Sequence, residues 1–163
     1  MRRPLALAAV VLAALAGPAH AQNAGQIAHV KAGAACPRCN LFQADFANLN
    51  LKGRNLAGAR LRQADLSAVL AGRARFAGGD LRDLNAYGAV MGGADFAHAD
   101  LTNATFVGAY LEGANFAGAK LSGVNFSGAE MAHARGLGQG QLAGACGDAS
   151  TQLPRGLRLP ACR

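Results

Sequence analysis

The stretch from Ala94 to Phe126 reads ADFAHADLTNATFVGAYLEGANFAGAKLSGVNF and has a large apolar residue at every fifth position. These positions are Phe96, Leu101, Phe106, Leu111, Phe116, Leu121 and Phe126. In a helix, a step of five turns the side chain by roughly 140°, so the large residues would spiral around every side. In a strand, an odd step would place successive large residues on opposite faces. The pattern therefore predicts a chain that turns a corner every five residues around a common interior.

The same five-residue phase extends over most of the chain. Steps of five from Leu41 to Met131 give nineteen positions, of which seventeen are Leu, Phe or Met and two are Ala. Two residues before these centres, alanine occupies twelve of the nineteen positions, which predicts a second, smaller inward side chain. Two residues after them, glycine recurs and supplies the backbone freedom that a corner needs. Arg54 occupies one of the alanine positions and is expected to turn outward.

Segments such as Ala64-Asp65-Leu66 resemble the A(D/N)Lxx motif of the pentapeptide repeat family. The resemblance covers the chain from Cys39 to about His133. It implies an all-β fold, a right-handed quadrilateral β-helix with four repeats to a coil and nearly five coils. Centres twenty residues apart would then share a column, and one column is leucine throughout: Leu41, Leu61, Leu81, Leu101 and Leu121. This uniformity supports four repeats per coil.

The five-residue period stops after Met131. The remaining sequence, from Gly136 to Arg163, resembles the C-terminal extension of many pentapeptide repeat proteins. We expect a short helix around Leu137 to Ala145, followed by a segment that folds back to cap the open end, because an uncapped solenoid exposes its strand edges. The predicted organisation is a signal peptide at 1–21, an N-terminal lead-in at 22–35, the β-helix at 36–133 and the cap at 134–163.

The first 21 residues have the pattern of a secretory signal peptide. They contain two arginines, an apolar stretch from Leu5 to Leu15 and an Ala19-His20-Ala21 cleavage pattern, which predicts cleavage after Ala21. The apolar stretch is shorter than the ~20 residues that span a bilayer. We therefore predict a periplasmic or secreted protein with no transmembrane segment in the mature chain. Removing the two arginines lowers the formal net charge from +7 to +5.

An even number of cysteines in an exported chain predicts disulfides. They are Cys36, Cys39, Cys146 and Cys162. Three pairings are possible, and neighbour with neighbour is the simplest. A redox site at the Cys-x-x-Cys pair is the alternative, although the pair lacks a βαβ context and a helix start. Zinc is disfavoured because the second pair lacks knuckle spacing, so we predict neither a metal nor a cofactor.

Two groups of outward positions are candidate interaction surfaces. An apolar group should cluster near one edge of the solenoid and predicts dimerisation or docking of a protein partner. Its members are Leu70, Tyr87, Val90, Val107 and Tyr110. A basic group in the N-terminal half predicts contact with an anionic envelope surface, such as lipid or cell-wall polymer. Its members are Arg60, Arg62, Arg73, Arg75 and Arg82.

The sequence shows no Ser-His-Asp arrangement, no phosphate-binding glycine loop and no acid pair in a pocket. The leading interpretation is a non-catalytic, exported structural or protein-interaction scaffold. Envelope binding through the basic group and a thiol oxidoreductase that uses Cys36 and Cys39 are the alternatives. Some members of the family protect DNA gyrase by imitating duplex DNA with an acidic surface in the cytoplasm. This chain is basic and predicted to be exported, and no aromatic residues interleave with its arginines, so nucleic acid is not a predicted partner.

Overall fold

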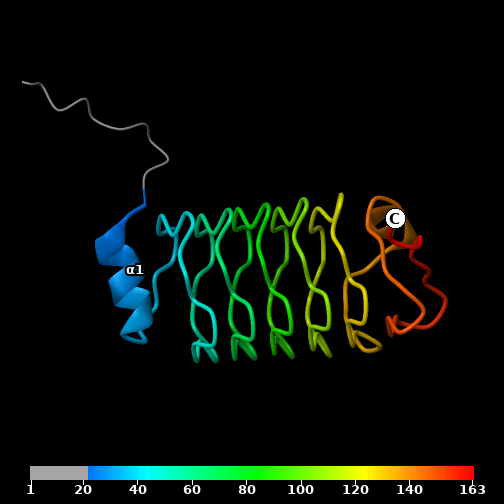
Figure 1. The fold of residues 1–163 in the computed structure, drawn as a ribbon, viewed down its shortest axis with the longest axis horizontal. Coiled ribbons are helices and arrows are strands. Elements are labelled where there is room, and N and C mark those ends of the chain that lie inside the picture. Colours follow the sequence, from blue (N-terminus) through cyan, green and yellow to red (C-terminus); the bar gives the residue numbers. More distant parts are fainter. Residues whose placement is uncertain (1–21) are drawn as a thin grey trace, which may run out of the picture.

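The computed structural model describes residues 22–163, which form a solenoid held by parallel β-bridges between residues twenty apart. One such ladder joins Asn50 to Leu70, Leu70 to Val90 and Val90 to Tyr110. Each turn therefore contains four repeats, and Figure 1 shows the turns stacked along one axis from cyan to yellow. The expected all-β architecture consists, in the described residues, of isolated bridges rather than continuous strands, with a helix near each end. The predicted signal peptide lies outside the described residues.

The predicted core is confirmed position by position. All nineteen centres of the five-residue pattern are buried, and the most exposed of them, Leu121, reaches only 2 %. The alanines two residues before the centres are buried as well. Phenylalanine rings stack through successive turns, with 5.3 Å between the ring centroids of Phe76 and Phe96 and 5.2 Å between those of Phe96 and Phe116. Each buried ring is desolvated by its own turn and by its neighbours.

The corners of the solenoid have a left-handed backbone, as the recurrent glycines predict, but nine corners have other residues. Arg73 and His98, for example, have φ angles of 58° and 57°. The amide of Arg73 donates to the carbonyl of Gly92 in the next turn at 2.9 Å, and the other eight non-glycine corners donate in the same way. This repeated hydrogen bond holds a conformation that a non-glycine residue adopts only at a cost. Glycine is thus favoured at these corners but not required.

Helix α1, Ala24–Lys31, was not predicted and lies at the N-terminal end of the solenoid (Figure 1). The side chain of Asn23 caps it by accepting from the amide of Gln26 at 3.0 Å. Val30 is fully buried and Ile27 packs against the core. Oε1 of Gln26 accepts from the amide of Asn40 at 2.6 Å, in the place that a carbonyl of a preceding turn would occupy. The helix therefore supplies both an apolar cover and a substitute ladder acceptor.

Arg54 does not turn fully outward, contrary to expectation. The residue is half-buried, its Nε is buried, and a Cβ added to Gly33 would lie 3.1 Å from its Nη2. The side chain thus extends beneath the segment that follows α1. The lead-in covers this arginine because the first turn has no turn before it to fill the same space.

The tail continues two sides of the solenoid after the five-residue period has ended. Bridges join Asn125 to Cys146 and Glu130 to Gln152, at spacings of 21 and 22 residues rather than 20. Helix α2, Gln139–Leu142, occupies part of the predicted range of 137–145. Nε2 of Gln141 donates to the carbonyls of Phe116 and Ala119, both at 3.1 Å. Figure 1 shows this segment, in orange and red, at the end opposite α1.

Asp148 fastens the tail to the last complete turn, and its titration can be followed. The pKa of Asp148 is lowered from 3.8 to about 2 because its carboxylate accepts from the hydroxyl of Ser150 at 2.7 Å, the amide of Gly128 at 3.0 Å and other donors of the turn. A depressed pKa means that the contribution to stability is complete above 3.8 and is lost as the pH falls towards 2. We expect the Gly128 amide proton to titrate with a midpoint near pH 2 in NMR spectra. Asp148→Asn should abolish this titration, and a flat wild-type shift between pH 1.5 and 5 would contradict the assignment.

Candidate functional site

The most unusual surface feature is an apolar ridge formed by Leu70, Val90 and Tyr110. These residues occupy successive positions of one bridge ladder, so they lie above one another on one side of the solenoid. Their exposed fractions are 38 %, 39 % and 42 %. The ladder continues with Asn50 before the ridge and Glu130 after it, and we call the side that bears this ladder the ridge side. A contiguous group of exposed apolar side chains is typical of an interaction surface.

Glycines beside the ridge make room for the Tyr110 ring. Gly92 stands two residues after Val90, one turn before Tyr110, and a Cβ added there would lie 2.8 Å from Cε1 and 3.2 Å from Cδ1 of Tyr110. The edge of the ring therefore rests on Gly92. Gly72 stands at the equivalent position one turn earlier. Sequence reasoning identified Tyr110 but missed these two glycines, although they follow the bridge residues Leu70 and Val90 at the same interval.

Tyr87 and Val107 lie on the preceding side of the solenoid, at the edge it shares with the ridge side. Tyr87 is the most exposed large apolar residue of the described chain, at 60 %, whereas Val107 is half-buried. The amide of Tyr87 donates to Oδ1 of Asn85 at 3.2 Å, which fixes the backbone at this corner. The predicted apolar group is therefore divided between two sides that meet at one edge.

The predicted basic group is divided between two neighbouring sides of the solenoid. Arg60 is bridged to Asp80, whereas Arg75 is bridged to Asp95 on a side fifteen residues further along the coil. Arg73 lies at the corner between the ridge side and the side of Arg75. The five arginines thus do not share one side.

Acidic partners also neutralise part of this basic group. Arg82 donates to both carboxylate oxygens of Asp80, at 2.7 and 2.8 Å, and Nε of Arg62 lies 3.6 Å from Oδ2 of Asp83. The hydrogen bond from Arg82 lowers the pKa of Asp80 more than burial raises it, and the same contact raises the pKa of Arg82. The Arg82–Asp80 pair therefore remains charged at neutral pH, and opposite charges so close together cancel much of the local field.

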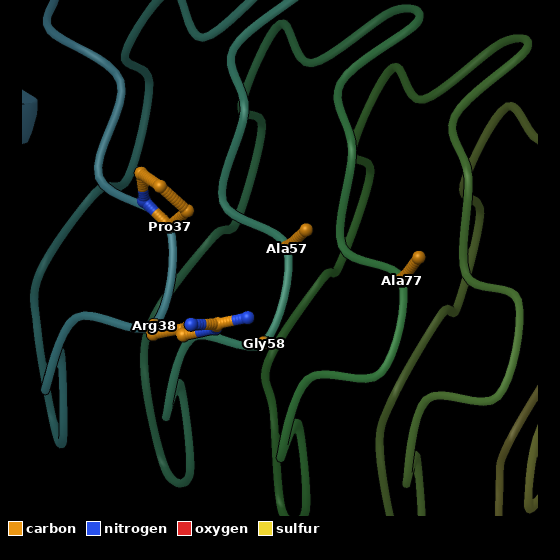
Figure 2. A pocket seen from close by; sticks show the side chains of 5 residues that line it. All are labelled: Pro37, Arg38, Ala57, Gly58 and Ala77. Carbon is orange, nitrogen blue, oxygen red and sulfur yellow. The ribbon is translucent and has the colours of Figure 1, made fainter.

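A shallow hollow of about 560 Å³ lies at the N-terminal end of another side. Its walls are Pro37, Arg38, Ala57, Gly58 and Ala77, which come from three successive turns (Figure 2). The Arg38 side chain extends over Gly58, where an added Cβ would lie 3.2 Å from Cγ of Arg38. Small side chains form the rest of the floor, so the hollow offers one guanidinium and few other polar groups.

All four cysteines are paired, neighbour with neighbour. Cys36 bonds to Cys39 with 5.5 Å between the Cα atoms, and Cys146 bonds to Cys162 with 4.8 Å between them. The first pair joins two inward positions of the first turn, and the second closes the tail. Within residues 22–163, no group of three or more His, Cys, Asp or Glu side chains could hold a metal ion. Over the same range, no helix has the length and apolar character required to cross a membrane.

Comparison with known proteins identifies the repeat. The family model described as pentapeptide repeats matches residues 38–70 and 72–106, with eight copies. Residues 38–70 and 72–106 of this chain are therefore pentapeptide repeats. No curated protein shows significant sequence similarity to the chain.

Solved structures of pentapeptide repeat proteins resemble it. Rfr23 from the cyanobacterium Cyanothece 51142 is 29 % identical with a TM-score of 0.50, and the match covers 50 % of this chain and 56 % of Rfr23. The protein alr5209 from Nostoc Pcc 7120 is 25 % identical with a TM-score of 0.43, and the match covers 84 % and 88 % of the two chains. The thylakoid-lumen protein AT2G44920 from Arabidopsis thaliana is 24 % identical with a TM-score of 0.31, over 68 % of this chain and 58 % of that one. The match thus spans just over half the length of Rfr23.

Proposed function

We propose that this protein is an exported, non-catalytic pentapeptide repeat scaffold that binds a protein through the apolar ridge. The observation that carries the proposal is the exposure of Leu70, Val90 and Tyr110 on a solenoid whose other large apolar side chains, Tyr87 excepted, are buried or half-buried. Exposed apolar side chains in register give a partner a flat contact surface without any change in the solenoid. The narrow interior is filled by side chains, which leaves the function to the outside surface.

Two disulfides support export, because such bonds persist in oxidising compartments. We propose that residues 1–21 are removed as a signal peptide and that the mature chain is periplasmic or secreted. The lead-in, 22–35, would precede a right-handed quadrilateral β-helix of nearly five coils over 36–133. Residues 134–163 would form the cap, which is consistent with the hydrogen bonds that Gln141 and Asp148 make to the last turns.

The two alternative functions have less support. Envelope binding needs a continuous positive surface, whereas the five arginines are divided between two sides and Arg62 and Arg82 face Asp83 and Asp80. A thiol oxidoreductase needs an accessible thiolate. Cys36 and Cys39 are bonded to each other and both are nearly inaccessible, at 5 % and 9 %. The ridge therefore remains the best candidate for the functional surface.

A photo-crosslinking amino acid placed at Val90 in the exported protein tests the scaffold function. We expect adducts with a protein, whether another chain or a second copy, and no adducts from the same probe at Ala97, which lies on another side. Tyr110→Arg should lower the yield at Val90 about fivefold or more, because it places a charge within the contact. Equal yields from Val90 and Ala97, or no adducts at Val90, would contradict the proposal.

A further inference from the structure

Charges on the ridge side are ordered along the solenoid axis. Lys52 and Arg73 flank the ridge towards the N-terminal end, and Glu112 and Glu130 flank it towards the C-terminal end. Lys52 and Glu130 are exposed, and within residues 22–163 neither has an ion-pair partner. The ridge side therefore has a positive end, an apolar middle and a negative end.

A surface with this order of charges is complementary to a second copy of itself that runs in the opposite direction along the solenoid axis. If a second copy faces the ridge side with its turns in opposite order, a two-fold axis parallel to the bridged segments can pass beside Val90. Val90 then meets Val90 of the second copy, and Leu70 meets Tyr110 of the second copy. The repeat of Lys52 faces the repeat of Glu130, so these exposed charges meet their opposites. The repeat of Arg73 faces that of Glu112, whose carboxylate also lies 2.7 Å from Nδ1 of His133 in its own chain. With the turns in the same order, like charges would lie together.

The glycines fit this reversed arrangement. Gly92 shares the turn of Val90, so the axis brings Gly92 of both copies face to face. The Tyr110 ring rests on Gly92. Each copy therefore brings one tyrosine ring to the axis, where the two rings can pack against each other over a floor without side chains. A larger residue at 92 would displace the ring and separate the copies.

We propose that the partner of the ridge side is a second copy of this chain, related by that two-fold axis. The inference rests on the proposed scaffold function and names its partner. Five bridged positions at a spacing of ~4.8 Å give a contact only about 20 Å long. That length is at the low end for specific interfaces, which bury ~800 Å² per partner. The dimer is thus a reversible one whose population depends on protein concentration.

Charge reversal tests the arrangement in the oxidised mature protein, by sedimentation velocity over a dilution series. Lys52→Glu alone and Glu130→Lys alone should each raise the dimer dissociation constant about tenfold, because each places like charges together at two symmetric positions. The double variant should return to within about threefold of wild type. An equimolar mixture of the two single variants should also dimerise like wild type, because every contact in the mixed dimer is then an opposite pair. Arg38→Glu has the same net charge change as Lys52→Glu, lies away from the ridge side and should have no effect.

The outcomes separate this inference from the proposed function. Monomeric wild type at every concentration, or single variants that dimerise as tightly as wild type, would overturn the two-fold dimer. If Val90 crosslinks to another protein while the wild type is monomeric, the scaffold function stands and only the second copy is excluded. If wild type dimerises but Val90→Arg leaves the dimer intact, association occurs through another side and the inference is equally overturned.

Discussion

Phe96→Ala should lower the free energy of unfolding by about 3–5 kcal/mol, the range for truncating a fully buried aromatic side chain. Phe96 is fully buried and stands in the middle of the phenylalanine stack. Its ring stacks on Phe76 and Phe116 and meets Phe106 edge-on, with 5.7 Å between the latter centroids. Truncation removes three aromatic contacts and leaves a cavity that the neighbouring turns cannot close, because the bridge ladders fix their spacing. Urea unfolding of the oxidised protein measures the change.

Two control variants show whether the loss comes from the cavity in the stack. Phe96→Leu keeps an apolar side chain at the site and should cost clearly less than Phe96→Ala. Tyr87→Ala removes an aromatic ring that is 60 % exposed, so the change should stay within about 0.5 kcal/mol. A loss below about 1.5 kcal/mol for Phe96→Ala would show that the turns collapse onto the cavity. That result would contradict the claim that the bridge ladders hold the phenylalanine stack rigid.

The interior of this protein could be predicted because one short pattern decides it. A step of five excludes helix and strand, and an unbroken phase forces every centre from Leu41 to Met131 to the same side of the backbone. The twenty-residue column of leucines likewise predicts the partners of the bridge ladders. Substitutions such as the alanines at 71 and 86 leave the register intact, because each bridge uses only backbone groups.

The ends could not be predicted from the repeat, because a period says nothing about where it stops. The sequence does contain a capping signal for helix α1, Asn23 followed by Gln26. The helix could have been predicted from that signal. The role of Gln26 as an acceptor for Asn40 depends on how the helix docks. The tail also departs from the period, since its bridges to Asn125 and Glu130 have spacings of 21 and 22 residues.

The candidate surface was predictable in its apolar part and not in its charged part. Column positions place Leu70, Val90 and Tyr110 on one ladder, as the structure does. The arginines were grouped by their position along the chain, whereas side chains fifteen residues apart face different sides of a four-sided coil. Arg82 pairs with Asp80, two residues earlier in the chain, only in a side-chain rotamer that brings the guanidinium to the carboxylate. The spacing in the sequence does not specify that rotamer.

Removing the Cys146–Cys162 bond should release the tail. The bond has a sequence separation of 16, and closing a loop of that size stabilises a fold by ~3 kcal/mol in the chain-entropy model. It also holds the bridge between Gly147 and Ala161 beside the one between Cys146 and Asn125. Cys146→Ala/Cys162→Ala should therefore lower the free energy of unfolding by ~3 kcal/mol.

Limited trypsin digestion shows whether that loss is local to the tail. Arg155 and Arg158 lie between the two cysteines in the segment that the bond closes, so cleavage after them should accelerate about tenfold or more in the double variant. Cys36→Ala/Cys39→Ala is the matched control, because it removes the other bond, at the opposite end of the solenoid, and should leave tail cleavage unchanged. Acceleration in both variants would mean that the solenoid unfolds as one unit. No acceleration in either would mean that the hydrogen bonds of Asp148 and Gln141 hold the tail without the disulfide.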